Sequence, residues 1–245
     1  MVRDVRFYGE SGTSIGAYLV EPSTGCPSTG CAGILFVHWL EPEASNSNRT
    51  QFLTEAKELA GRGTVSLLVE TMWSDKEWFD KRNPERDFDS SVEQVRNLRR
   101  ALDVLLAQPG VDSSRIAYVG HDFGMMYGAL VIAVDPRVKV AALQAGTSEL
   151  SDWFLLGRKL SPETTQSVKD TLKPLAPIRY VPRFHGAILL QFGTKDPYVP
   201  PAKAAALANA ANEPKQIRYY DCGHAMNAEA KADRDQWLGA ALKLR

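Results

Sequence analysis

Residues 116–124 read Ile-Ala-Tyr-Val-Gly-His-Asp-Phe-Gly, and this stretch decides the fold. The apolar run Ile116–Val119 predicts a buried strand, and the small and apolar residues of Phe123–Val134 predict a helix directly after it. Between them, the pattern Gly-x-Asp-x-Gly is typical of a sharp turn that presents a nucleophile at a strand end. The glycines are needed because the neighbours of the strained central residue must lack bulk. We therefore predict that Asp122 is a nucleophile, at a position where serine is commonest.

An acid and a histidine follow the turn in the chain order that such a site requires. Asp196 lies just after the apolar stretch Ala187–Phe192, and His224 lies just after Gln216–Tyr220. Both stretches are predicted strands, so a carboxylate in one strand-end loop can reach an imidazole in the next. The sequence predicts a catalytic triad of Asp122, Asp196 and His224.

The rest of the chain alternates short apolar runs with amphipathic stretches, which predicts parallel strands joined by helices. The predicted strands are Arg3–Phe7, Ser14–Val20, Ala32–His38, Val65–Glu70, Ile116–Gly120, Val138–Leu143, Ala187–Phe192 and Gln216–Tyr220. The predicted helices are Thr50–Ala60, Ser90–Ala107, Phe123–Val134, Ser161–Leu172, Pro201–Ala211 and Ala228–Leu244. The fold class is therefore α/β, and we expect one domain over residues 1–245.

One long segment interrupts this alternation. Residues Gln144–Gly186 separate two consecutive predicted strands and contain Pro174, Pro177 and Pro182. Long insertions at the carboxyl side of a strand often cover a site. A small lid over 144–186 and an ordinary long crossover are both compatible with this pattern.

These motifs resemble the α/β-hydrolase superfamily, in particular its dienelactone-hydrolase-like group, over nearly the whole length of the chain. The resemblance is carried by Gly120–Gly124, by Gly193–Pro200 with its Asp-Pro-Tyr-Val-Pro, by Gly223-His224 and by Leu175–Phe184. It implies an eight-stranded, mostly parallel sheet with helices on both faces, a small cap or none, and a site at the carboxyl ends of the strands. That group usually has Cys or Ser as the nucleophile. In having Asp122, the chain is more similar to epoxide hydrolases and to haloalkane or haloacid dehalogenases.

The chemistry of a carboxylate nucleophile points to the same classes. An aspartate is already ionised at neutral pH, so Asp122 does not need His224 for its attack. Attack on an ester carbonyl would give an energetic anhydride, whereas attack on a carbon–halogen or epoxide carbon gives an ordinary ester. His224, oriented by Asp196, would then activate water to hydrolyse that ester.

Two alternatives stay open. One is a carboxylic ester or lactone hydrolase of the dienelactone-hydrolase type, in which Asp122 acts as a base on water or as a poor nucleophile. The other is a catalytically silent protein that binds a ligand in its pocket, although Asp196 and His224 are not needed for packing.

The hydrolysis step needs hydrogen-bond donors for a developing oxyanion. The N–H of Phe123 is one candidate, and the second is that of Trp39 or Leu40, in the loop after a strand. Substrate-binding candidates are Trp39, Trp73, Trp153 and Tyr198, for which packing is an equally good interpretation. Trp78 and Tyr180 are further aromatic candidates, whereas His38, His121 and His185 are expected to be structural or surface residues.

Composition excludes some classes of partner. The 245 residues contain 29 Lys+Arg and 29 Asp+Glu, so the electrostatic signature of a nucleic-acid binder is missing. No apolar run approaches a membrane span, and charges stand where a signal peptide would be apolar. We expect a cytoplasmic monomer or homodimer that acts on a small molecule, without cofactor or metal. Cys26 and Cys31 flank a turn-rich stretch and could meet across a tight loop, but without a secretory signal we expect all three cysteines to be free thiols.

Overall fold

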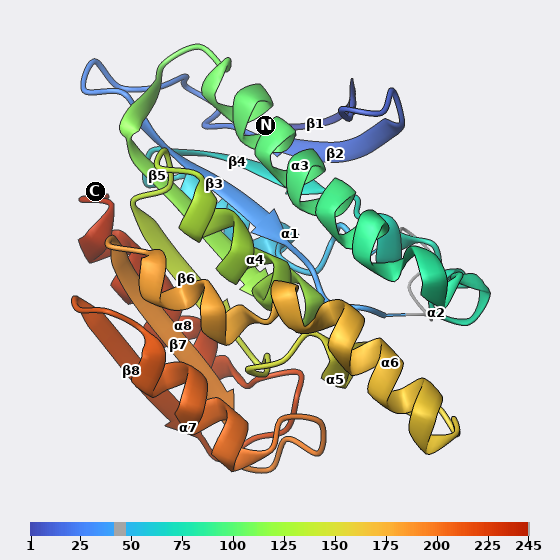
Figure 1. Ribbon diagram of the computed structural model, residues 1–245. Coiled ribbons are helices and arrows are strands. Elements are labelled where there is room, and N and C mark those ends of the chain that lie inside the picture. Colours follow the sequence, from blue (N-terminus) through green and yellow to red (C-terminus); the bar gives the residue numbers. More distant parts are fainter. Residues whose placement is uncertain (42–47, 245) are drawn as a thin grey trace.

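The strands form one twisted sheet in the computed structural model, which describes residues 1–41 and 48–244 (Figure 1). Within these residues the sheet has eight strands in the order β1-β2-β4-β3-β5-β6-β7-β8. The strands are β1 (Val2–Tyr8), β2 (Ser14–Val20), β3 (Cys31–Val37), β4 (Thr64–Val69), β5 (Val111–His121), β6 (Val140–Gln144), β7 (Ala187–Gly193) and β8 (Lys215–Tyr220). The predicted eight-stranded, mostly parallel sheet is confirmed.

Only the first part of the sheet is antiparallel. β1 pairs with β2, and β2 pairs with β4, in antiparallel register. From β4 to β8 all neighbouring strands are parallel, as in the pairs Val119–Ala142 and Leu143–Leu190. The carboxyl ends of β3, β5, β6, β7 and β8 therefore lie along one edge of the sheet, where the predicted site residues follow.

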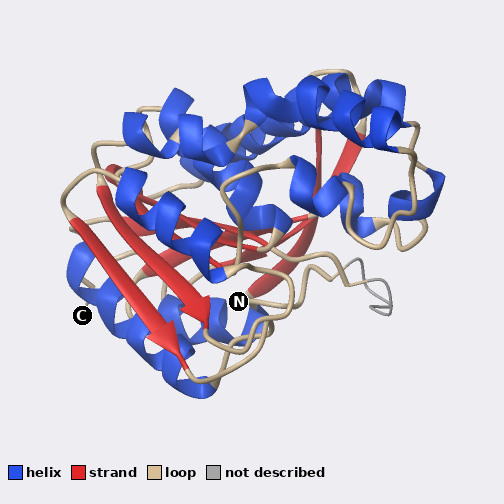
Figure 2. Ribbon diagram, turned by 60° about the horizontal axis from the view of Figure 1, so that its bottom comes forward, coloured by secondary structure: helices blue, strands red, loops and turns tan. Residues whose placement is uncertain are grey.

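Helices cover both faces of the sheet (Figure 2). The helices are α1 (Leu53–Ala60), α2 (Trp78–Lys81), α3 (Asp87–Leu106), α4 (Phe123–Val134), α5 (Ser151–Phe154), α6 (Pro162–Leu172), α7 (Pro201–Ala210) and α8 (Ala228–Ala241). Residues of α1 and α8 share one apolar core, and residues of α3, α4, α6 and α7 share the other. Strands covered in this way are apolar on both sides, which is why every residue of β3, β4 and β6 is buried.

Helix α4 is central to the arrangement because it is apolar on all sides. Its residues from Phe123 to Ile132 are buried, so the helix is sealed between the sheet and its neighbours. At its first turn the hydroxyl of Tyr118, on β5, donates a 2.8 Å hydrogen bond to the carbonyl of Gly124. This contact fixes the start of α4 against the end of β5.

The predicted elements agree with the structure to within a few residues, and the differences have local causes. Strand β5 begins at Val111 instead of Ile116, because its first half is polar and partly exposed, and carries no apolar signal. Helix α1 begins at Leu53 because residues 48–52 form turns. The short helices α2 and α5 were not predicted, since four residues are too few for a helical period.

The long segment between β6 and β7 packs onto the carboxyl edge of the sheet. It contains α5, α6 and three single turns of 3-10 helix at 173–175, 177–179 and 181–183. Trp153 and Phe154 of α5 are buried, and the ring of Phe154 lies 5.8 Å from that of Phe123 at the start of α4. Its action as a lid stays a prediction.

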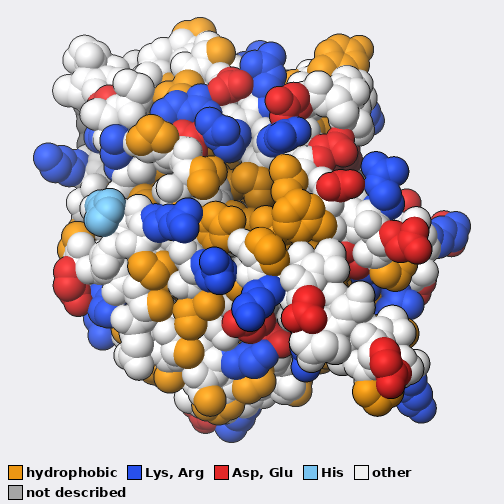
Figure 3. Space-filling view, in the orientation of Figure 1, with side chains coloured by type: hydrophobic (Ala, Val, Ile, Leu, Met, Phe, Trp, Pro, Cys, Tyr) orange, Lys and Arg blue, Asp and Glu red, His pale blue; other side chains and the backbone are white. Residues whose placement is uncertain are grey.

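Charged side chains of both signs are spread over the face that α3, α4 and α6 cover, around a central group of apolar side chains (Figure 3). This mixture agrees with the zero net charge of the chain. Within residues 1–41 and 48–244, no helix is long and apolar enough to cross a membrane.

The expectation of free thiols is wrong for two of the three cysteines. Cys26 and Cys31 form a disulfide across five positions, with their Cα atoms 5.2 Å apart. The turn at Pro27–Gly30 brings them together, since Gly30 has a φ of 78° and its N–H donates to the carbonyl of Pro27. Disulfides are rare in cytosolic proteins, so this bond gives no support to the predicted cytoplasmic location.

Replacing Cys26 with Ser should lower the free energy of unfolding, because the disulfide reduces the entropy of the unfolded chain. The loss should be only about 2 kcal/mol, since the closed loop is short. Urea denaturation of the wild type with and without a thiol reductant measures the effect. The reductant should destabilise the wild type and leave the Cys26→Ser, Cys31→Ser double variant unchanged. Equal sensitivity of both proteins would contradict the prediction.

Candidate active site

Asp122 occupies a strained turn between β5 and α4, as predicted. Its φ of 57° and ψ of −118° are unusual for a residue with a side chain. A Cβ atom on Gly124 would lie 2.1 Å from the carbonyl oxygen of Val37, so only glycine allows α4 to approach β3 this closely. The N–H of Asp122 donates to the carbonyl of Gln144 on the neighbouring strand at 3.1 Å. The strain is thus held by contacts on both sides of the turn.

Two backbone amides hold the carboxylate of Asp122. The N–H of Leu40, in the loop after β3, donates to Oδ2 at 3.0 Å, and the N–H of Phe123 also donates to this side chain. The N–H of Trp39 instead donates to Oε1 of Gln51 at 2.8 Å. Of the three predicted oxyanion residues, Leu40 and Phe123 therefore present their amides to Asp122, and Trp39 does not.

His224 and Asp196 meet as the sequence predicts. Nδ1 of His224 lies 2.8 Å from Oδ2 of Asp196, across the loops that follow β8 and β7. The other oxygen of Asp196 accepts the N–H groups of Tyr198 and Val199 at 2.8 and 3.3 Å. Because the carboxylate is fixed in this way and holds Nδ1–H, Nε2 is the nitrogen of His224 that can exchange a proton with water.

Burial raises the pKa of Asp122 to about 6. The charge of His224 and the hydrogen bonds from the Leu40 and Phe123 amides act in the opposite direction and lower this pKa. Burial alone would lower the pKa of His224. The hydrogen bond to Asp196 and the negative charges of Asp122 and Asp196 outweigh it, and the pKa is raised above 6.5. Asp122 and His224 thus favour each other's charged forms.

Three aromatic side chains surround the imidazole of His224. Trp39 stacks on it with ring centroids 5.8 Å apart, and the rings of Trp153 and Tyr198 meet it at right angles at 5.7 and 5.1 Å. They come from the connections that follow β3, β6 and β7, and Asp122 itself is only 7% exposed. Three of the four predicted substrate-binding residues therefore lie beside the triad.

The indole of Trp153 has a feature that the sequence could not reveal. The side chain is 2% exposed, and its Nε1 has no hydrogen-bond partner within the described residues. A buried donor left unpaired costs about 1–3 kcal/mol, so such atoms are rare in folded proteins and suggest an absent partner.

Trp73, the fourth predicted substrate-binding residue, lies behind the site. Its indole N–H donates to the carbonyl of His38 at 3.1 Å, and its ring stacks on Phe123 and Tyr127. It is therefore not available as a donor to substrate, and it supports Phe123 by packing. Trp78 meets Phe123 edge to face, while the hydroxyl of Tyr180 donates to the carbonyl of Pro174, away from the triad.

The histidines other than His224 are not placed as proton-transfer groups. His38 is buried, which lowers its pKa to about 4, and its ring contacts the carbonyl of Trp39 and the hydroxyl of Ser74. Burial and the charge of His224 hold the pKa of His121 well below 6.5. His185 is exposed.

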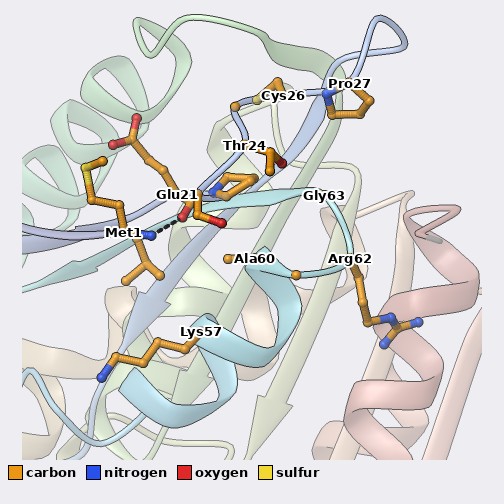
Figure 4. Close-up of a pocket in the computed structure, with 14 residues that line it drawn as sticks. Met1, Glu21, Thr24, Cys26, Pro27, Lys57, Ala60, Arg62 and Gly63 are labelled. Carbon is orange, nitrogen blue, oxygen red and sulfur yellow. Dashed lines mark hydrogen bonds between the residues drawn. The ribbon is translucent and has the colours of Figure 1, made fainter.

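A groove elsewhere on the surface contains none of the predicted site residues. It lies between the loop 21–27 and the end of α1 at residues 60–63, where the terminal amine of Met1 donates to the carbonyl of Glu21 (Figure 4). This groove is near the amino ends of β3 and β4. Asp122 follows the carboxyl end of β5, so the groove and the triad lie toward opposite edges of the parallel sheet.

The sheet, the strained turn and the triad order together define an α/β hydrolase. The family model of the prolyl oligopeptidase family matches residues 51–241, and the chain belongs to this family. The predicted α/β-hydrolase superfamily is thus supported.

Among curated proteins, the acylamino-acid-releasing enzyme of Rattus norvegicus is 22% identical over 172 residues, which are 62% of this chain and 23% of that enzyme. The chain thus matches less than a quarter of that relative's length.

Solved structures with the same fold include the acetyl xylan esterase from Paenibacillus sp. R4, with a TM-score of 0.75 and 18% identity, covering 98% of this chain and 84% of that one. A putative dienelactone hydrolase from Klebsiella pneumoniae subsp. pneumoniae MGH 78578 has a TM-score of 0.72 and 17% identity, over 99% and 98% of the two chains. At these identities the likeness concerns the fold. The resemblance to dehalogenases and epoxide hydrolases, carried by Asp122, gains no support from these comparisons.

Replacing Asp122 with Asn should stabilise the protein at pH 7. The pKa of Asp122 is about 6 in the folded protein, against an ordinary 3.8, so the fold favours the neutral acid. At pH 7 the carboxyl is nevertheless ionised, and this lowers the free energy of unfolding. Between these two values the folded state binds more protons than the unfolded state, so stability falls as pH rises, by about 3 kcal/mol in total.

Urea denaturation of the wild type and of Asp122→Asn at about pH 7 and pH 4 measures this difference. The variant should be more stable at the higher pH by up to about 3 kcal/mol, and its advantage should vanish at the lower one. An advantage that is equal at both pH values, or absent at both, would show that Asp122 is not held as described.

Proposed function

We propose that this protein is a hydrolase in which Asp122 attacks an alkyl carbon, of a carbon–halogen bond or an epoxide, and forms an aspartyl ester. One observation carries the proposal: the carboxylate of Asp122 accepts the amide of Leu40 at Oδ2 and also the amide of Phe123, the two donors expected for an oxyanion. A carboxylate held there has Oδ2 fixed by the Leu40 amide, and in the proposed reaction Oδ1 is the oxygen that attacks. The Leu40 amide remains on Oδ2, which becomes the carbonyl oxygen of the ester.

The first step needs only an ionised Asp122. Its free oxygen forms a bond to the substrate carbon as the bond to the leaving group breaks, and the electron pair departs with the leaving group. Alkylation removes the negative charge of Asp122, which is one of the charges that raise the pKa of His224. The imidazole therefore becomes less basic at this point and releases its proton more readily, as the second step requires.

The second step uses the rest of the triad. Nε2 of His224 takes a proton from water, and the hydroxide adds to the carboxyl carbon of Asp122. Negative charge then develops on Oδ2, where the Leu40 amide lies 3.0 Å away. When this intermediate collapses, the alcohol leaves with the proton from His224. Asp122 is then a carboxylic acid, and it releases its proton to solvent to restore the carboxylate.

The departing group needs a donor, and Trp153 supplies one. Its unpartnered Nε1–H belongs to a ring that contacts both Phe123 and His224. Tyr198, 46% exposed and also in contact with His224, is a second donor near the solvent. An indole suits a halide and a phenol suits an epoxide oxygen, so the site has groups for either class.

Hydrolysis of a carboxylic ester or lactone is the second candidate, and the comparisons favour it over the first. The family is one of peptidases, and the similar structures are named as esterases and a dienelactone hydrolase. In this case His224 would activate water against the substrate carbonyl. The substrate oxygen would then have to displace Oδ2 of Asp122 from the Leu40 amide.

Trapping of the ester distinguishes the two candidates. In His224→Ala the second step is blocked, so incubation with bromohexane or styrene oxide should leave one alkyl group on the protein, seen in its intact mass and mapped to Asp122. The double variant Asp122→Asn, His224→Ala is the matched control and should stay unmodified. Turnover of nitrophenyl acetate by the wild type, with no adduct from either alkyl probe, would favour ester hydrolysis and overturn the first candidate.

Loss of the Trp153 donor should slow alkylation. Trp153→Phe keeps an aromatic ring but removes the N–H, and the rate of adduct formation by bromohexane should fall about 10-fold or more. Trp237→Phe, in α8 on the other face of the sheet, serves as the control with the same change. Equal rates of adduct formation in the two variants would show that Trp153 does not donate to the leaving group.

A further inference from the structure

Gln51 joins two parts of the candidate active site, although it belongs to neither. It lies in the turn before α1, where its Oε1 accepts the N–H of Trp39 at 2.8 Å and its Nε2 lies 2.5 Å from Nδ1 of His121. On the other side of the His121 ring, Nε2 lies 2.9 Å from the carbonyl oxygen of His224. One continuous line of hydrogen bonds therefore runs from the loop after β3 to the loop after β8.

Every hydrogen bond in this line has a determined direction. The backbone N–H of Trp39 can only donate, so the amide oxygen of Gln51 faces it and the amide nitrogen faces His121. His121 must therefore accept at Nδ1 and carry its proton on Nε2, which donates to the carbonyl of His224. Burial, which lowers the pKa of His121, keeps the ring in this neutral form.

The line determines which amide of the loop after β3 reaches Asp122. Because Gln51 takes the N–H of Trp39, that group points away from the carboxylate. The carbonyl of Trp39 is in turn held by the ring of His38 at 2.6 Å and by the side-chain amide of Asn48 at 3.1 Å. This carbonyl shares a peptide plane with the N–H of Leu40, so these bonds direct the Leu40 amide toward Oδ2.

The line also anchors the proton-transfer residue. His121 directly precedes Asp122 in the strained turn. Its ring is hydrogen-bonded to the backbone carbonyl of His224, while Asp196 is hydrogen-bonded to the imidazole of His224. Its ring also lies 4.7 Å from that of Trp39, in a stacked arrangement. The carboxylate, its amide donor and the imidazole are thus tied together through one buried ring.

We propose that Gln51 and His121 are positioning residues, which hold the Leu40 amide and the imidazole of His224 in the correct places relative to Asp122. Neither side chain touches the reacting atoms. The expected effect of this positioning on the reaction rate rests on the proposed function, whereas the line of hydrogen bonds does not.

The kinetic experiment compares Gln51→Leu with Gln94→Leu. Gln94 is a matched control because it is also an amide whose Oε1 accepts a loop N–H, that of Met72 at 2.8 Å, away from the triad. With bromohexane, or with nitrophenyl acetate if only esters are turned over, Gln51→Leu should lower kcat by about 10- to 100-fold and leave KM nearly unchanged. A fall in kcat no larger than that of Gln94→Leu would overturn the proposal.

A second readout needs no substrate. The chain has four histidines, so ring resonances can be followed individually by NMR. In the wild type, His121 should stay in the neutral Nε2–H form between about pH 5 and 9. In Gln51→Glu, the donor to Nδ1 becomes an acceptor, so His121 should take up a second proton within this range. The Leu40 amide and His224 resonances should shift in both Gln51 variants and stay in place in Gln94→Leu.

The two readouts separate failure of this inference from failure of the proposed function. If no probe is turned over but the NMR shifts occur as described, the positioning line stands and the assigned reaction is wrong. If His121 titrates in the wild type, or if Gln51→Leu leaves Leu40 and His224 unshifted, the line does not exist in solution and the inference is overturned.

Discussion

The hydrogen bond from the Leu40 amide to Oδ2 of Asp122 is the contact on which the account of this site depends. In the proposed mechanism the same amide is an oxyanion donor, so this bond relates the identity of residue 122 to the course of the proposed reaction. The bond exists only because the Gly124 position lets the start of α4 meet the end of β3. The fold thus acts on the chemistry through a close backbone approach at the crossing of two elements.

The supporting contacts lie on both faces of the sheet. On one side, Trp73 and Trp78 pack against Phe123 and hold the start of α4. On the other, the buried Arg234 of α8 pairs with Glu55 of α1 and donates to the side chain of Gln144, whose carbonyl receives the Asp122 N–H. A buried cation with several acceptors is costly to leave unpaired, so this cluster locks the strand ends in one arrangement.

Sequence patterns were sufficient for the fold, for the strained turn at Asp122 and for the meeting of Asp196 with His224. The bounds of α4 were predicted to the residue because an apolar run begins at a glycine-flanked turn and ends before Asp135-Pro136. Asp196 and His224 were predicted to meet because parallel strands bring their ends to one edge. Both inferences depend on order along the chain, which the sequence contains.

Features that depend on the direction of single groups could not be predicted. From the sequence, Trp39 and Leu40 are equivalent as amide donors, because their peptide planes are not determined by it. Trp73 and Trp153 are likewise equivalent, but in the structure the indole of Trp73 donates a hydrogen bond and that of Trp153 has no partner among the described residues. Gln51 gave no signal, since a glutamine before a helix is ordinary. The Cys26–Cys31 bond was missed because spacing alone does not show how a turn directs two side chains.

The fate of water oxygen tests the central claim most directly. A single turnover of bromohexane, with enzyme in excess in heavy-oxygen water, would be followed by mass analysis of both the product and the peptide that contains Asp122. An aspartyl ester predicts that the heavy oxygen enters the carboxylate of Asp122 and that the first alcohol carries ordinary oxygen. Heavy oxygen in the alcohol, with Asp122 unlabelled, would contradict the account, because water would then have attacked the substrate itself.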